Sequence, residues 1–325
     1  MKILNSDLYD GKYDIFELEV MERIASVSVK SSHPGRNHVA QLVDHFEVKG
    51  PNGTHVCMIF VLLGSSISKQ TTDAQTEHLA ATAVKQIATQ VLLALDFIHT
   101  ECQIIHTDIS PQNICLELTD PRTLVHEAQA DAQGNIQLST PSIIANFETF
   151  NVRLNDFGIA CFFDRHLTDS ISPPLLRAPE ITLGAPWDAK VDVFNLGALL
   201  LQFITGQLPF PGKGARNTRW CHESDRLTQL IENFGGEPDV VLQNADRADE
   251  FAGNGVDLAG KSRRVGDGKA FDHWVAGNTV GTGLGVEEVP LLCDLLRRML
   301  ATDPRRRESP ARLLEHPWLS DVPSV

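Results

Sequence analysis

Residues 104–116 read IIHTDISPQNICL, a short polar turn between two apolar runs. The turn places Asp108 before Asn113 at the spacing DxxxxN. Phosphoryl transfer requires a carboxylate that accepts the hydroxyl proton, and oxygen ligands for the magnesium that neutralises the phosphates. Asp108 has the chemistry for the first task, and the amide oxygen of Asn113 for the second. Taken alone, the segment could also be a structural turn, because Asp, Pro and Asn all favour turns.

Four further motifs follow this segment along the chain. They are DFG at 156–158, LRAPE at 176–180, Asp192 at the start of an apolar stretch, and DPRRR at 303–307. Each motif alone could be a turn, a helix cap or a surface charge run. Together, however, they follow the signature order of protein kinases. The sequence therefore resembles that family, which implies an α+β, two-lobed fold.

The first 64 residues predict a small, β-rich N-lobe. Apolar residues recur at helical spacing over 15–29, and two strand-like runs follow at 39–46 and 54–63. The resemblance implies that the hinge between the lobes ends this unit at residue 64. Residues 65–325 predict a mainly helical C-lobe, with a polar loop insertion at about 117–150.

Three stretches narrow the resemblance to SR-protein kinases. Thr107 stands in the HTD triplet where most kinases carry Arg, and GTHVCMIFVLLG occupies residues 53–64. The stretch PLLRAPEITLGAPW at 174–187 is similar to fungal members of that group. Nearly the whole chain resembles the group, although residues 117–150 and 240–285 match only loosely.

The resemblance implies ATP and Mg²⁺ as cofactors and assigns roles to the matching residues. Asp108 would be the catalytic base, and Asn113 and Asp156 would hold magnesium. Glu180 would pair with Arg307 as a structural salt bridge, and Asp192 would anchor the catalytic loop. Four residues would form the adenine site, at its back, along the hinge backbone and on its floor: Phe60, Val61, Leu63 and Cys115. Plain core packing is the alternative for Phe60 and Cys115.

The glycine-rich loop that normally precedes these motifs does not occur before them here. The cluster GTGLGV at 281–286 follows every catalytic motif and has the spacing GxGxG, so we do not expect it to bind phosphate. Lys2 resembles the phosphate-binding lysine, and we interpret the sequence as N-terminally truncated relative to the family. Its partner would be Glu17, with Glu19 as the second choice. A frayed terminal lysine is the alternative reading.

Two departures from the family pattern bear on chemistry and regulation. Ser110 replaces a lysine that many Ser/Thr kinases place near the transferring phosphate, which removes a cationic contact. Thr107 replaces the arginine that reads a phosphorylated activation loop in most kinases. The lack of this arginine predicts that phosphorylation of the activation loop does not switch the activity on.

The formal net charge of −14 predicts a surface that repels nucleic acid and anionic membranes and attracts basic partners, with plain solubility as the alternative reading. We therefore expect a basic protein substrate, and the resemblance suggests an Arg/Ser-rich one. No apolar stretch long enough for a membrane span and no signal peptide are expected. Six cysteines without a CxxC pair fit reduced thiols in the cytoplasm, the nucleus or both.

Two functions from different classes follow. The first is an ATP- and Mg²⁺-dependent protein serine/threonine kinase. The second is a catalytically impaired kinase-fold protein, or a truncated fragment, that acts as a binding module. The second is suggested because no glycine-rich loop precedes the catalytic motifs in this sequence.

Overall fold

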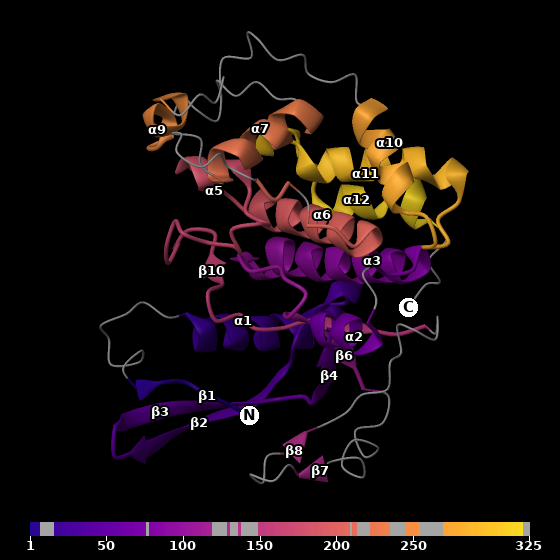
Figure 1. The fold of residues 1–325 in the computed structure, drawn as a ribbon. Coiled ribbons are helices and arrows are strands. Elements are labelled where there is room, and N and C mark those ends of the chain that lie inside the picture. The colour runs from indigo at the N-terminus through magenta and orange to yellow at the C-terminus, as the bar shows by residue number, and fades with distance from the viewer. Residues whose placement is uncertain are drawn as a thin grey trace.

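The structure is a computed structural model. It describes residues 1–6, 16–75, 78–118, 129–130, 136–137, 149–208, 210–212, 222–234, 245–253 and 269–320. Figure 1 shows a strand-rich part around α1 and, across from it, a part built mainly of helices. The architecture is α+β, as the sequence predicts.

An antiparallel sheet in the order β1-β3-β2 forms the strand-rich part. Its strands are β1 (Lys2–Ile3), β2 (Leu42–Gly50) and β3 (Gly53–Phe60), and Lys2 lies opposite Met58. The sheet packs against α1 (Glu17–Lys30) through a small cluster around Val56 and Met58, which Leu18 of α1 contacts. Helix α1 in turn buries Val20, Met21 and Ile24, the stripe whose spacing predicts a helix.

The predicted helix and strands of this part are found with shifted ends. The strand expected at 39–46 runs from Leu42 to Gly50, because pairing with β3 continues to the turn at 51–52. Val39 instead forms an isolated parallel bridge with Leu154, and the backbone N–H of Ala40 donates to the Leu154 carbonyl at 2.8 Å. A pattern of apolar residues cannot distinguish these two pairings.

The helical part is assembled around two long helices, α3 (Ala81–Phe97) and α6 (Lys190–Thr205). The other helices are α2 (Ile67–Ala74), α5 (Pro179–Leu183), α7 (His222–Phe234), α9 (Ala248–Gly253), α10 (Lys269–Asn278), α11 (Val289–Leu300) and α12 (Pro310–Leu314). Single-turn 3₁₀ helices lie at Pro34–His38 (η2), Val286–Glu288 (η5), Pro304–Arg306 (η6) and Pro317–Leu319 (η7). One π-helical turn, η3 (Ile98–Cys102), ends α3.

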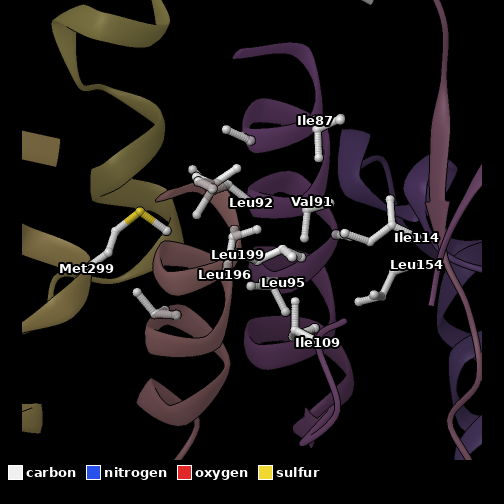
Figure 2. Close-up of a cluster of buried hydrophobic side chains, with 14 of the residues drawn as sticks. Ile87, Val91, Leu92, Leu95, Ile109, Ile114, Leu154, Leu196, Leu199 and Met299 are labelled. Carbon is white, nitrogen blue, oxygen red and sulfur yellow. The ribbon is translucent and has the colours of Figure 1, made fainter. Parts of the chain in front are cut away.

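The main hydrophobic core lies between α3 and its neighbours. In Figure 2, Val91 of α3 faces Ile114 and Leu154, while Leu199 of α6 lies on the other side of α3. Met299 of α11 points toward α6 from beyond it. All five side chains are at most 1 % exposed, and burying such a side chain contributes about 1.5–3 kcal/mol. The core thus fixes α3 and α6, from which the functional loops extend.

Short antiparallel strand pairs hold the loops between the two parts. The sheet β4-β6-β9 comprises Leu63–Ser66, Ile114–Glu117 and Val152–Leu154, and β5 (Ile104–Ile105) pairs with β10 (Cys161–Phe162). The segment with Asp108 therefore lies between β5 and β6, and the DFG motif lies between β9 and β10. The topology brings the two motifs together although they are far apart in sequence.

Two further features expected from the sequence are the insertion at about 117–150 and the glycine cluster at 281–286. Most of the insertion predicted at 117–150 is outside the described residues, which there include only its ends and the strand pair β7 (Gln129–Ala130) and β8 (Ile136–Gln137). The glycine cluster at 281–286 joins α10 to η5 in the helical part, where the Thr282 carbonyl accepts a hydrogen bond from the N–H of Ala81 at 2.8 Å.

Helix α3 with its π turn, Ala81–Cys102, is long and apolar enough to cross a membrane by length and composition alone. In the structure 67% of its most apolar window is buried inside the protein. The same stretch is thus accounted for as the central core helix, as Figure 2 shows.

Gly35 lies where the segment after α1 packs closely on α3. It lies in η2, which packs along α3, and a Cβ atom at this position would lie 1.8 Å from the carbonyl oxygen of Leu93. His33 fixes the same loop, since its Nε2 lies 3.0 Å from Asp96 Oδ2. Only glycine fits here without displacing backbone.

We expect Gly35→Ala to lower the free energy of unfolding by about 1–3 kcal/mol, the usual cost of overpacking a close contact. Thermal and urea unfolding would measure the change. Gly277→Ala in α10 is the matched control, because a Cβ atom there would meet no other atom within 4 Å and alanine favours the helix. Equal melting temperatures for Gly35→Ala and the parent protein would contradict this account of the contact.

Candidate active site

One buried carboxylate, that of Asp192, holds the backbone of the loop after β5. Asp192, in the first turn of α6, is fully buried and accepts the backbone N–H groups of His106 and Thr107, each at 2.8 Å. His99 contacts the same carboxylate at 2.9 Å, and the π turn η3 carries its ring there. The carboxylate thus fixes the backbone immediately before Asp108.

Thr107 adopts a conformation that needs this support. Its φ is 68°, a left-handed value that is unfavourable for a β-branched residue. Such strain costs about 1–3 kcal/mol and persists only when its surroundings impose it. Besides the Asp192 bond, the Thr107 hydroxyl donates to the Ile159 carbonyl at 2.9 Å, and the Thr107 carbonyl accepts from the Ser172 hydroxyl at 2.9 Å.

Asp108 and Asn113 lie together at the end of this loop. The Asn113 amide nitrogen donates to the Asp108 carbonyl at 2.9 Å and to its Oδ2 at 2.7 Å. Because the nitrogen faces Asp108, the amide oxygen of Asn113 points to the other side as a potential ligand. The Asp108 side chain stays partly exposed, so a hydroxyl group can reach it.

The DFG segment holds Asp156 next to the loop that carries Asp108. Asp156 has a φ of 60°, and its side chain is 49% exposed. The next side chain, Phe157, is buried and packs edge-on against the His106 ring with centroids 4.7 Å apart. His106 Nε2 also lies 3.1 Å from the Asn155 carbonyl oxygen, so the two loops are joined on both sides of Asp156.

Lys2 bridges two acidic residues from different elements. Its Nζ lies 2.5 Å from Glu17 Oε1 and 2.7 Å from Asp156 Oδ1. The structure thus places Glu17, the first choice of partner, beside Lys2, and Glu19 contacts Arg165 instead. The alternative of a frayed lysine is not what the structure shows, since β1 pairs with β3 on the residue itself.

The charges of this triad shift one another's proton affinities. Burial alone would lower the pKa of the Lys2 ammonium, but its bonds to Asp156 and Glu17 outweigh this and raise it. Partial burial would raise the pKa of the Asp156 carboxyl, yet the Lys2 contact holds it below its ordinary value. Burial raises the pKa of the Glu17 carboxyl, and the Lys2 charge offsets part of that rise.

A cavity of about 250 Å³ opens beside the triad. Besides Lys2, Glu17 and Asp156, its lining includes the following residues: Met1, Met21, Phe60, Val61, Leu62, Leu63, Asn155 and Phe157. Such a concave, mixed lining is typical of ligand sites, although the volume is slightly below the usual range of roughly 300–1,000 Å³. The structure therefore brings Phe60, Val61 and Leu63 to the same cavity as Lys2.

Two of the predicted adenine-site residues, Val61 and Cys115, differ in how they relate to the cavity. The backbone N–H of Val61 donates to the Gln41 carbonyl at 3.1 Å, which leaves only its carbonyl for a ligand. Cys115 is not among the lining residues. It is buried in β6 next to Asn155, which does line the cavity, and burial raises the pKa of its thiol.

The side-chain oxygens of Asp156 and Asn113 are donors of the type that suits a hard divalent cation. Asp156 supplies a carboxylate and Asn113 an amide oxygen, the donor types that Mg²⁺ prefers, usually with water and substrate phosphates completing its shell. Within the described residues no group of three or more His, Cys, Asp or Glu side chains could hold a metal by itself. The donor set therefore suits a metal that arrives with a phosphate ligand.

Comparison with known proteins decides the family. Residues 17–319 match the protein kinase domain. The chain belongs to the protein kinase family. It is 28% identical to the serine/threonine-protein kinase SRPK of Physarum polycephalum, over 99% of this chain and 80% of that protein. It is 29% identical to a serine/threonine protein kinase of Aspergillus fumigatus, over 93% and 74%, and 23% identical to protein kinase dsk1 of Schizosaccharomyces pombe, over 99% and 76%.

These findings confirm the resemblance to SR-protein kinases and the α+β kinase fold. The kinase-type salt bridge between Glu180 and Arg307 is present and fully buried, with Arg307 Nη2 2.6 Å from Glu180 Oε2. Arg307 also lies over the ring of Phe194, with 4.9 Å between its guanidinium carbon and the centroid. The pair attaches the end of the activation segment, residues 156–180, to the helical lobe.

Sequence reasoning missed three contacts of this kinase site. His99 supports Asp192, and Asn195 of α6 accepts the Ser172 hydroxyl at 2.8 Å. Arg165 contacts α1 from the activation segment. A histidine or arginine within a motif-free stretch gives no signal of its own. Only Asn195 could have been suspected, because an amide on an otherwise apolar helix needs a buried partner.

We expect Asp192→Ala to lower the free energy of unfolding by about 3 kcal/mol or more, because three buried donors lose their acceptor. Urea unfolding would measure this loss. Asp188→Ala is the control, since Asp188 is exposed and its carboxylate accepts the backbone N–H of Lys190, the first residue of α6. A loss for Asp192→Ala no larger than for Asp188→Ala would be inconsistent with the role given to this carboxylate.

Proposed function

We propose that the chain is a protein serine/threonine kinase that transfers the γ-phosphoryl group of ATP, with Mg²⁺, to hydroxyl groups of protein substrates. One observation carries the proposal. Lys2 bridges Glu17 and Asp156 at the cavity whose far wall is the hinge, and the Asp108–Asn113 pair lies on the adjoining loop. The kinase family generally uses ATP and Mg²⁺ for this transfer.

The residues divide the work as follows. Lys2, held by Glu17, would bind the nucleotide phosphates. The Val61 carbonyl would accept a hydrogen bond from adenine, and the Leu63 N–H would donate one. Phe60 would close the back of the pocket, and Cys115 would support its floor through Asn155. Asn113 and Asp156 would hold Mg²⁺, which supplies positive charge to the phosphates when bound.

In the transfer, the substrate hydroxyl oxygen bonds to the γ-phosphorus while the bond to the bridging oxygen breaks. The bridging oxygen keeps the electron pair and leaves with ADP. Asp108 orients the hydroxyl group and accepts its proton. Asn113 fixes the Asp108 carboxylate through its amide nitrogen, so the same side chain can position the base and offer its oxygen to the metal.

We further propose a basic, Arg/Ser-rich substrate and an intracellular location in the cytoplasm, the nucleus or both. The net charge of −14 favours attraction of basic segments, and the relatives include SRPK. Ser110, where many kinases have lysine, is buried and adds no positive charge near Asp108. Five cysteines of the described part are free thiols, which agrees with a reducing compartment.

Thermal unfolding with Mg-ATP tests the nucleotide site. Binding to the native state raises the melting temperature by mass action, so we expect a rise of a few degrees with millimolar nucleotide. We expect Asp156→Asn to lose this rise, because it removes a metal ligand and the charge beside Lys2. Glu315→Gln, an exposed change in the distant C-terminal region, serves as the control.

Phosphate transfer to Arg/Ser peptides tests the catalytic base separately. We expect Asp108→Asn to keep the nucleotide-dependent rise but to transfer phosphate about 10²–10⁴-fold more slowly, the usual contribution of a general base. A parent protein that unfolds cooperatively but shows neither a nucleotide effect nor transfer would instead support the binding-module alternative.

A further inference from the structure

A tight turn in the activation segment presents Arg165 to α1. The N–H of Arg165 donates to the Phe162 carbonyl at 3.2 Å, and the two residues form an isolated antiparallel bridge. Strand β10 fixes the start of this turn, because Phe162 pairs with Ile104 next to the catalytic loop. The position of Arg165 is therefore tied to the same backbone that carries Asp108.

Arg165 contacts α1 through charge and through aromatic faces. Its Nη2 donates to Glu19 Oε1 at 2.5 Å. Its guanidinium carbon lies 4.7 Å from the ring centroid of Phe16 and 4.6 Å from that of Phe162. The two rings also contact each other, with centroids 6.0 Å apart. The guanidinium thus contacts Phe162 of the activation segment, Phe16 just before α1 and Glu19 of α1.

Phe16 and Glu19, which Arg165 contacts at the start of α1, lie on either side of Glu17 in the sequence. Phe16 precedes the helix, and its carbonyl accepts the N–H of Val20 at 2.7 Å, so Phe16 closes the first turn. Glu19 lies in that turn. Glu17, between them, is buried and pairs with Lys2. Any shift of this turn therefore moves Glu17 relative to Lys2.

We propose that Arg165 is a positioning residue, which holds the first turn of α1 so that Glu17 stays paired with Lys2 without a phosphate on the activation segment. The inference rests on the proposed kinase function and adds a route by which the activation segment controls the nucleotide site. It also assigns a role to Glu19, which anchors the turn while Glu17 binds Lys2.

Each contact of Arg165 is weak by itself. The Arg165 and Glu19 side chains are about half exposed, and exposed ion pairs and cation–π contacts are each small effects. Their sum biases the position of α1 and does not hold the fold together. Loss of Arg165 should therefore change the site much more than the global stability.

The experiment compares the full chain with Arg165→Ala, Arg165→Lys and the control Arg312→Ala. Arg312 is also an exposed arginine paired with a glutamate, but it lies in α12. The first readout is hydrogen–deuterium exchange of amides in residues 16–24. The second is kcat/KM for ATP with an Arg/Ser peptide, and melting temperatures report on global stability.

For Arg165→Ala we expect faster exchange in residues 16–24 and a loss of about tenfold in kcat/KM, which three weak contacts together account for. The melting temperature should stay within about two degrees of the parent value, as for most surface substitutions. Arg165→Lys should recover part of both effects, because it keeps the charge but not the planar guanidinium. Arg312→Ala should change neither readout.

A charge exchange provides a second test. Glu19→Arg and Arg165→Glu should each speed up exchange in α1, and the double variant should recover part of the protection because the ion pair is restored in reverse. Unchanged exchange in Arg165→Ala, or a double variant no better than either single one, would overturn the inference. A parent protein without nucleotide binding or transfer would count against the proposed function, while the exchange readout would still judge Arg165.

Discussion

The buried carboxylate of Asp192 is the constraint on which the site depends. It takes up two backbone N–H groups of a loop that would not adopt its conformation unaided, since Thr107 is β-branched and has a positive φ. A charged acceptor without solvent contact must be satisfied by donors, and here the donors belong to the residues before Asp108. The geometry of the catalytic loop is thereby set by α6, a helix at the centre of the hydrophobic core.

The same core helix also fixes the activation segment. Asn195, one turn after Asp192, accepts the Ser172 hydroxyl and donates to the Leu176 carbonyl at 2.6 Å. The Ser172 hydroxyl oxygen also lies 2.9 Å from the Thr107 carbonyl oxygen, so its one proton is shared between the two acceptors. The catalytic loop and the activation segment are therefore both held by hydrogen bonds to α6. The contacts that join them are side-chain hydrogen bonds of Asn195 and Ser172.

Much of this arrangement could be predicted from the sequence, for identifiable reasons. The helices over 190–205 and 289–300 were predictable because apolar spacing over many residues specifies a buried face. Asp108, Asn113 and Asp156 were singled out through motif order, and Glu17 through the resemblance to relatives and its spacing from Lys2. The contacts of His99 and Arg165 could not be predicted, because they depend on a π turn and on a packing of two segments far apart in sequence.

The close packing at Gly35 has a mechanical consequence for α1. Arg36 binds the last carbonyls of this helix, since its Nη1 lies 3.0 Å from the Ser28 oxygen and 2.6 Å from the Ser31 oxygen. The C-terminal end of α1 is thus a fixed pivot on the helical lobe. Glu17 lies at the other end, about 20 Å away at 1.5 Å per residue. A rotation of about 10° around the pivot would move Glu17 by about 3.5 Å, more than the length of its bond to Lys2. In such a rotation the helix would act as a lever, because a small angular change at its anchored C-terminal end would lengthen the ion pair at its N-terminal end.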